Sequence, residues 1–411
     1  MTTKIVLALS GRGANDAING MITDYSDAIA AVGLSVVQIS LEPAELQYAM
    51  GQINGGNVAF GLTWLGIGQD LSVNVDGRQT NLWEASRTPL LKLHGDHPAY
   101  FAARHSDTPR NSVNFYVASE FIAYRRKWLR EARALTALLP PMPLAPLEKA
   151  EVTSKSRRNG KLVFLKNGND PKQLRTAWQE RLPHAVTNLL DELTEQITPV
   201  GLKRGPLQIA DFVAASLERR GIDPDSARYF IPFFTAQMDD YLRRVKSTMI
   251  ARSLLDLPII VQGSNWEHVD FAGRRAQLLP GQDFDHSKRI FIDQLGVIDM
   301  SPNLDSGPHE RVMRAAGNYS LVLTNHQTWV GESLAGFDDL MFDFNPDSIA
   351  ARASDVIAHR DRYLELALSF GDAFRARYPR ERVGNAMVDM AELAVLQWSP
   401  EKPSIQPFFI W

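Results

Sequence analysis

Residues 4–41 decide the fold class of this chain. They read KIVLALSGRGANDAINGMITDYSDAIAAVGLSVVQISL, in which two apolar runs of strand length flank an amphipathic stretch. Within 15–32 the apolar side chains recur every three or four residues, which is typical of a helix with one buried face. A strand, a helix and a second strand in this order predict a parallel sheet that is covered by helices.

The same alternation runs through most of the chain, with one long interruption. Between 172 and about 256 the apolar residues keep helical spacing, and Pro and Gly separate the helices. The sequence therefore predicts two Rossmann-like, doubly wound α/β domains, the second with a helical insertion at about 172–256. The predicted strands are 4–10, 34–41, 57–63, 89–94, 112–118 and 135–139, then 161–166, 257–262, 276–279, 296–300, 320–325 and 340–344.

Proline and charge mark the boundary between the two domains. Four prolines fall within 139–146, where neither a helix nor a central strand accommodates them, and a charged stretch follows. We predict that the first domain covers 1–145, that a linker covers 146–160 and that the second domain covers 161–395. The apolar tail, 396–411, is expected to cross back to the first domain.

Composition excludes several classes of function. The 411 residues include 44 Lys+Arg and 47 Asp+Glu, a net charge of −3, so no global field attracts nucleic acid or an anionic membrane. The chain has no Cys, which excludes disulfides, thiolate metal sites and a Cys nucleophile. No apolar run approaches the ~20 residues of a membrane span, and the first is too short for a signal peptide. We expect a cytoplasmic protein, and the apolar faces of the inserted helices leave a homodimer contact possible.

Ligands of open parallel sheets bind beyond the carboxyl ends of the strands, so residues in those positions are site candidates. Gly11, Arg12 and Gly13 follow the first strand, where they would expose backbone amides to a ligand or simply form a tight turn. The third glycine of the dinucleotide fingerprint is missing, so a nicotinamide or flavin cofactor has little support.

A second candidate follows the fourth strand. His94, Asp96 and His97 stand together there, and a carboxylate beside an imidazole can act as a base or orient one. Alternatively, Asp96 caps the next helix and the histidines bond to the backbone. No further ligands stand at metal-binding spacing, so no metal is expected.

Two candidates in the second half suit a phosphate. Lys166, Asn167 and Gly168 end the first strand of that half with a cation and exposed amides, although a solvated turn would look the same. Further on, a helix start with free N–H groups and nearby donors would attract a diphosphate. Its residues are Ser306, Gly307, His309, Glu310, Arg311 and Arg314, of which Glu310 and Arg314 also fit an ordinary surface pair.

The order of these motifs resembles the GT-B type glycosyltransferases, in particular the CgeB-like branch of the group 1 transferases. The resembling segments are HGDHP at 94–98, IIVQGSNW at 259–266, SGPHERVMRAA at 306–316 and LVLTN at 321–325. Most of the match lies in the carboxy-terminal half, and the amino-terminal half matches by pattern.

The resemblance implies that the two domains face a cleft and bind a nucleotide-diphosphate sugar without a metal or other cofactor. It places the nucleotide base near Gly263 and the diphosphate over the helix start at 306–309, with Lys166 and Arg311 neutralising its charge. The acceptor, which is not identified, would lose its proton to Asp96 or His97 next to His94. The remaining residues expected at the donor are Asn167, Gly168, Trp266, Glu310, Arg314, Thr324 and Asn325.

Two positions depart from the family pattern. Arg314 stands where a glutamate usually holds the ribose hydroxyls, and Tyr319 stands where a glycine precedes the next strand. Arginine accepts no hydrogen bonds, so Glu310 would take the ribose, or the nucleotide would be held differently. A nucleotide-sugar epimerase of the same fold and a catalytically silent binding protein are the alternatives, and the sequence does not choose between inverting and retaining transfer.

Overall fold

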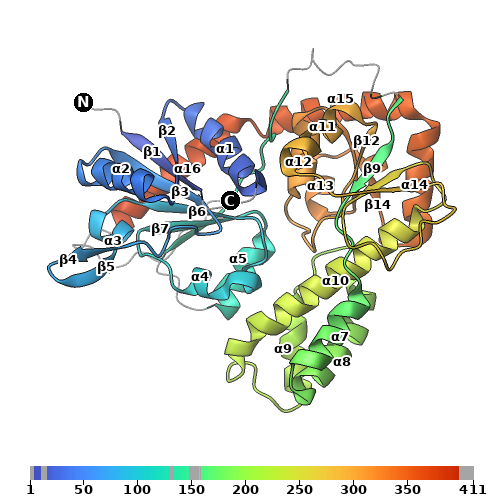
Figure 1. Cartoon of the computed structure of the whole chain (residues 1–411), viewed down its shortest axis with the longest axis horizontal. Coiled ribbons are helices and arrows are strands. Elements are labelled where there is room, and N and C mark those ends of the chain that lie inside the picture. Colours follow the sequence, from blue (N-terminus) through green and yellow to red (C-terminus); the bar gives the residue numbers. More distant parts are fainter. Residues whose placement is uncertain (1–3, 11–15, 130–133, 148–156, 158, 398–411) are drawn as a thin grey trace. The chain divides into compact units, whose positions relative to one another are not determined.

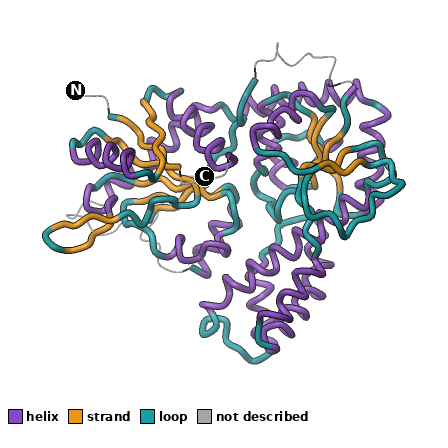
Figure 2. The backbone as a smooth tube through the Cα atoms, in the orientation of Figure 1, coloured by secondary structure: helices purple, strands orange, loops and turns teal. Residues whose placement is uncertain are grey.

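We describe the chain from a computed structural model, which covers residues 4–10, 16–129, 134–147, 157 and 159–397 (Figure 1). It divides into two compact units. The first unit comprises Met1–Met142 and Tyr378–Trp411, and the second comprises Pro143–Arg377. Figure 2 shows that each unit has its own sheet, with helices around the strands.

The first unit is built on a six-stranded parallel sheet in the order β2-β1-β3-β6-β7-β8. All six strands were predicted, because each is a short apolar run of strand length. The sequence did not reveal the antiparallel hairpin of β4 and β5, whose residues are mostly exposed. The sheet strands are β1 (Ile5–Ser10), β2 (Ser35–Ser40), β3 (Val58–Trp64), β6 (Leu90–His94), β7 (Ser112–Tyr116) and β8 (Leu135–Leu138), and the hairpin is β4 (Ser72–Val75) and β5 (Arg78–Asn81).

One face of this sheet is covered by α1 (Asp16–Ala30) and α16 (Arg380–Gln397), which pack against each other. A Cβ added to Gly384 would lie 2.2 Å from the Ala28 carbonyl oxygen, so the two backbones are in close contact. The second domain was expected to continue to residue 395, whereas the compact units divide at Tyr378 because α16 packs on the first sheet. Most of the predicted tail, 398–411, lies outside the described residues.

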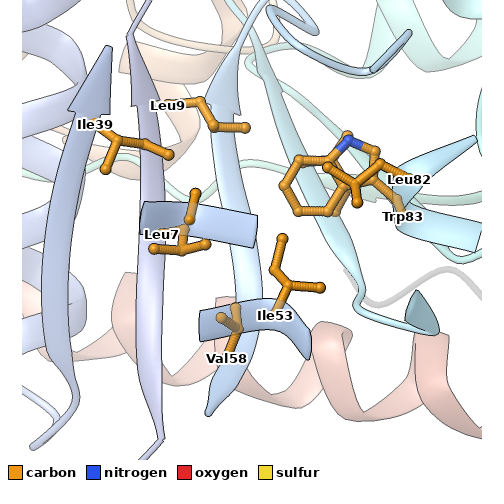
Figure 3. Close-up of a cluster of buried hydrophobic side chains, with 9 residues drawn as sticks. Leu7, Leu9, Ile39, Ile53, Val58, Leu82 and Trp83 are labelled. Carbon is orange, nitrogen blue, oxygen red and sulfur yellow. The ribbon is translucent and has the colours of Figure 1, made fainter. Parts of the chain in front are cut away.

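The other face of the sheet is apolar over β1, β2 and β3. Figure 3 shows Leu7 and Leu9 of β1 facing side chains from α2 (Pro43–Asn54) and α3 (Leu82–Ser86). The indole of Trp83 covers Gly61, where a Cβ would lie 2.7 Å from the ring, and its Nε1 donates to the Gly68 carbonyl at 2.8 Å. Beyond β3 the same face becomes polar, as described below.

The second unit contains another six-stranded parallel sheet, in the order β11-β10-β9-β12-β13-β14. Counted along the chain this is 3-2-1-4-5-6, the Rossmann order, and the direction of winding reverses between β9 and β12. The predicted class of two doubly wound α/β domains is thus confirmed. The strands are β9 (Leu162–Leu165), β10 (Ile260–Gln262), β11 (Gln277–Leu279), β12 (Gly296–Ile298), β13 (Leu321–Asn325) and β14 (Met341–Phe342).

The expected helical insertion separates β9 from β10. It consists of α7 (Pro171–Arg181), α8 (His184–Gly201), α9 (Ile209–Arg219) and α10 (Ile231–Ser253), and α10 packs against the other three. Asp170 caps α7 by accepting from Lys172 N at 2.8 Å. The later helices of this unit are α11 (Phe284–Asp293), α12 (Glu310–Gly317), α13 (Thr328–Ser333), α14 (Pro346–Ala358) and α15 (Arg360–Arg377).

The described ends of the predicted linker pack within the second unit, and so does Leu144 of the predicted first domain, because the second unit begins at Pro143. Leu144 N donates to the Met313 carbonyl at 3.3 Å and Leu147 N to the Gly317 carbonyl at 3.1 Å, which places this segment on α12. At the other end the guanidinium of Arg157 is buried and donates to four backbone carbonyls, those of Phe291, Ile292, Asn318 and Tyr319, at 2.7–2.9 Å. The intervening residues 148–156 and 158 lie outside the described part of the chain.

Candidate functional site

Lys166 follows β9 at the point where the winding of the second sheet reverses. Its backbone is held on both sides: Lys166 N donates to the Gln262 carbonyl at 3.0 Å, and its carbonyl accepts from Trp266 Nε1 at 2.9 Å. No described residue accepts a hydrogen bond from the Lys166 ammonium. The loop therefore presents a positioned cation whose donors are available to a ligand.

Tight packing between the loops after β9 and β10 explains the two glycines predicted here. Gly263 has φ +156°, and a Cβ on it would lie 2.1 Å from the Lys166 carbonyl oxygen. A Cβ on Gly168 would lie 2.1 Å from the Trp266 ring, while Asn167 Oδ1 accepts from Ser264 N at 2.9 Å. Trp266 is only 1% exposed, so it supports the loop and offers no face on which a nucleotide base could stack.

A buried carboxylate, Asp299, lies just beyond β12 and organises the next part of the site. Its Oδ1 is 2.7 Å from His309 Nδ1 and accepts from Arg311 at 3.3 Å, and its Oδ2 accepts from Thr324 Oγ1 at 3.3 Å. Burial by itself raises the pKa of Asp299, but His309 and Arg311 outweigh burial and hold that pKa below its usual value. His309, Arg311 and Thr324 were each predicted as site residues. The structure joins them through Asp299, which the sequence analysis missed.

The N-terminus of α12 begins beside this network. His309 is its N-cap residue, with extended backbone and no capping hydrogen bond from its side chain. The first amides of a helix have no intrahelical acceptor, and with the helix dipole they attract an anion. Just before the helix, Gly307 is buried and its carbonyl accepts from Gln327 Nε2 at 3.0 Å, while Ser306 is half-buried.

Positive charge gathers around Lys166. Its pKa is lowered to about 8, first by burial and then by the neighbouring guanidinium groups of Arg311 and Arg243, while Asp299 and Asp240 act in the opposite sense. Arg243 itself pairs with Asp239 at 2.7 Å. A loop in which Arg243 of α10 and Arg311 of α12 lower the pKa of Lys166 is suited to an anionic ligand.

Arg314 and Glu310 form a pair on α12 that points into the protein. Arg314 is 2% exposed, its Nε is 3.4 Å from Glu310 Oε2, and its guanidinium lies 4.5 Å from the centre of the Phe284 ring. Arg314 was predicted to contact the donor, but the structure buries it beneath Phe284. Tyr319 has φ +50°, the left-handed backbone that explains why a glycine is expected at this position.

A pocket lies at the carboxyl ends of β12, β13 and β14. Asn325 lies in its wall, where its Oδ1 accepts from Ser301 N at 2.8 Å. Lys246 enters from α10, donates to Asn303 Oδ1 at 2.7 Å and lies 4.5 Å from the centre of the Phe344 ring. Lys246 was missed because, on a long helix, a lysine looks like an ordinary solvated residue.

The loop after β6 in the first unit presents one available carboxylate. Asp96 is half-buried, and no described residue forms a hydrogen bond or ion pair with it. His97 caps the next turn, its Nδ1 accepting from Ala99 N at 3.1 Å, and its ring meets Phe121 and Tyr124 edge-on. His94 is 1% exposed, so it supports the loop from below.

The remaining predicted loop, Gly11, Arg12 and Gly13, lies outside the described residues. Among the residues that are described, no three His, Asp or Glu side chains are grouped so as to hold a metal ion. In the same part of the chain, no helix combines the length and apolar character needed to cross a membrane.

Neither a scan against protein-family models nor a search of curated proteins finds a match to this chain. Solved structures with a similar course of the chain include sucrose-phosphate synthase from Thermosynechococcus elongatus, at 9% identity, 95% coverage of this chain and 98% of that chain, with TM-score 0.46. AviGT4, a glycosyltransferase involved in avilamycin A biosynthesis, has 10% identity, 95% and 98% coverage and TM-score 0.47. Anabaena HepE, solved in complex with UDP and glucose, has 10% identity, 95% and 99% coverage and TM-score 0.46.

Proposed function

We propose that this protein is a glycosyltransferase that moves a sugar from a nucleotide-diphosphate sugar to an acceptor, in the cytoplasm and without a metal ion. The observation that carries the proposal is the juxtaposition of Lys166, Arg311 and the N-terminus of α12 where the winding of the second sheet reverses. Rossmann-type sheets bind nucleotides at this position, and these groups can hold a diphosphate.

Sugar transfer breaks the bond between the anomeric carbon and the diphosphate, so negative charge develops on the leaving phosphate oxygen. Lys166 and Arg311 stabilise that charge in the proposed mechanism, together with the amides at the start of α12. Asp299 acts as a positioning residue, because its Oδ1 holds both Arg311 and His309. A metal ion would supply the same charge stabilisation, and the cation cluster takes its place in this proposal.

Binding of nucleoside diphosphates tests the proposal most directly. We expect isothermal calorimetry with UDP, GDP, ADP, CDP and dTDP to find one that binds to the chain, and the same measurement with EDTA to give the same affinity. Absence of binding to every member of this panel would contradict the donor site and favour a silent binding protein. Donor isomerisation without any acceptor would favour an epimerase instead.

The pH dependence of binding follows from the lowered pKa of Lys166. Its cationic form predominates below about pH 8, so affinity for a nucleoside diphosphate should be highest there and should fall as the pH rises from 7 to 9.5. The diphosphate is fully ionised over this range, because phosphate groups lose their second proton near pH ~6. Calorimetry at half-unit intervals measures the effect, and Lys166→Met should abolish the step near pH 8; an unchanged step in this variant would assign it to another group.

For the acceptor proton we propose Asp96 as the base, because its carboxylate is available whereas His97 already caps a turn. If the reaction inverts the anomeric centre, Asp96→Asn should lower turnover about 10²–10⁴-fold, the usual contribution of a general base. His97→Ala should have a smaller effect. Release of nucleoside diphosphate in the presence of acceptor measures both, and undiminished turnover in the two variants would remove this loop from the mechanism.

A further inference from the structure

The first unit contains a layer of buried polar side chains on one face of its sheet. Parallel register places Thr63, Lys92, Asn114 and Thr136 side by side on β3, β6, β7 and β8. Partners in parallel register point to the same face, and every one of these four side chains is at most 2% exposed. The layer continues the face that carries Leu7 and Leu9 on β1, and its polar side chains begin with Thr63 on β3.

Two basic side chains are buried in this layer, and the described residues that accept hydrogen bonds from them are neutral. Lys92 Nζ donates to Gln69 Oε1 at 3.1 Å, and Arg125, on α5 (Ser119–Trp128), donates through Nη1 to Thr136 Oγ1 at 2.5 Å. Lys92 is 0% exposed and Arg125 is 4% exposed. Burying a charge away from water is costly unless an opposite charge accompanies it, and an arginine does not avoid this cost by losing its proton.

The described surroundings supply little opposite charge. Burial lowers the pKa of Lys92, and the guanidinium of Arg125 lowers it further. The carboxylate that raises this pKa is that of Asp107, which is exposed. Burial also lowers the pKa of Arg125, and the group acting against it is the phenol of Tyr116. That phenol stays neutral, because burial raises its own pKa above the usual value.

The hydrogen-bonding groups left over in the layer are mainly donors. Arg125 Nε and Nη2 and Asn114 Nδ2 are buried and have no hydrogen-bond partner among the described residues; the same holds for His94 Nδ1. Asn114 Oδ1, the acceptor of that amide, is already 2.9 Å from His94 Nε2. Unpaired donors from β7 and α5 thus accompany the uncompensated charge of Arg125 and the buried amine of Lys92.

We propose that Lys92, Asn114 and Arg125 bind a small monovalent inorganic anion, such as a halide or nitrate, inside the first unit. A water molecule would satisfy donors but would leave the charge of Arg125 uncompensated, whereas an anion compensates that charge and favours the protonated form of Lys92 as well. Lys92, Asn114 and Arg125 are each at most 4% exposed, so an anion held by them would be shielded from water. This inference concerns stability of the first unit and does not depend on the proposed transferase activity.

The experiment follows thermal unfolding of the full chain in sodium chloride or bromide against sodium gluconate at equal ionic strength. Because the bound anion stabilises the folded state only, the halides should raise the melting temperature by about 2–4 °C relative to gluconate, with saturation. Lys92→Met should lose this difference, and in gluconate it should melt no lower than the parent, because it removes a buried amine whose charged form is disfavoured by burial and by Arg125. Arg78→Met, an exposed change in the same unit, is the control and should retain the full halide effect.

Direct localisation tests the same site without a variant. Crystals of the parent protein grown in sodium bromide should show an anomalous peak among Lys92 Nζ, Asn114 Nδ2 and the Arg125 guanidinium. Equal melting temperatures in halide and gluconate would overturn the proposal, and so would a halide effect that persists in Lys92→Met. Bromide crystals without a peak at this position would overturn it as well, even if Lys92→Met failed to fold.

Discussion

Replacing Lys166 by methionine should lower kcat for sugar transfer about 10²–10³-fold, the usual cost of removing one group that stabilises developing negative charge. Methionine keeps the length and apolar stem of the side chain, and the backbone hydrogen bonds that hold the loop are unaffected. The change also removes a cation that Arg311 and Arg243 repel, so the melting temperature should not fall. Steady-state release of nucleoside diphosphate and a thermal melt measure the two effects.

Lys161→Met provides the matched control for this prediction. Lys161 lies directly before β9, whereas Lys166 lies directly after it. The Nζ of Lys161 donates to Gln277 Oε1 at 2.9 Å on the protein surface. This variant should retain parental kcat. Equal activity in the two variants would contradict the role of Lys166, whereas loss in Lys166→Met together with a lower melting temperature would indicate damage to the fold.

Replacing Arg157 by methionine should lower the free energy of unfolding of the second unit by about 3–5 kcal/mol. The guanidinium holds the end of α11 and the turn after α12 together through four carbonyl oxygens. Without the guanidinium these four carbonyls lose their buried donor. Methionine has no donor, so it restores none of the four hydrogen bonds. Urea denaturation of the full chain, followed by tryptophan fluorescence, measures the change.

Arg274→Met is the control for the stability measurement. Arg274 forms an exposed ion pair with Asp256 at 3.0 Å, and such pairs contribute about 0–1 kcal/mol. A loss in Arg157→Met no larger than in this control would show that the buried guanidinium does not hold the segment in place. Arg157→Lys should be intermediate, since an ammonium reaches fewer of the four carbonyls.

The strands and the parallel class could be predicted because their signals are local. Each strand of the two sheets is a short apolar run bounded by turn residues, and the runs alternate with helical periodicity. The hairpin of β4 and β5 escaped this reasoning because its side chains are mostly exposed and leave no apolar pattern. The end of the second unit was not predicted either. The sequence of α16 is that of an ordinary amphipathic helix, and only its packing on α1 assigns it to the first unit.

Candidate site residues were found in part, for a topological reason. Lys166, His309 and Arg311 were predicted because they follow strands, and ligands of such sheets bind there. Asp299 has no comparable signal: it is one carboxylate at the end of an apolar run, and only its contacts with His309, Arg311 and Thr324 reveal its place. Lys92 was overlooked within its strand for the same reason.

The sequence by itself determined where the strands lie, that they form two parallel α/β sheets and which loops end at their carboxyl edges. It could do so because hydrophobic periodicity and turn chemistry act over a few neighbouring residues. Only the tertiary structure decided that Trp266 is buried, that Arg314 points under Phe284, and that Asp299 joins residues from α12 and β13. Those outcomes depend on contacts between segments far apart in the chain, and no local pattern encodes which side chains such contacts bury.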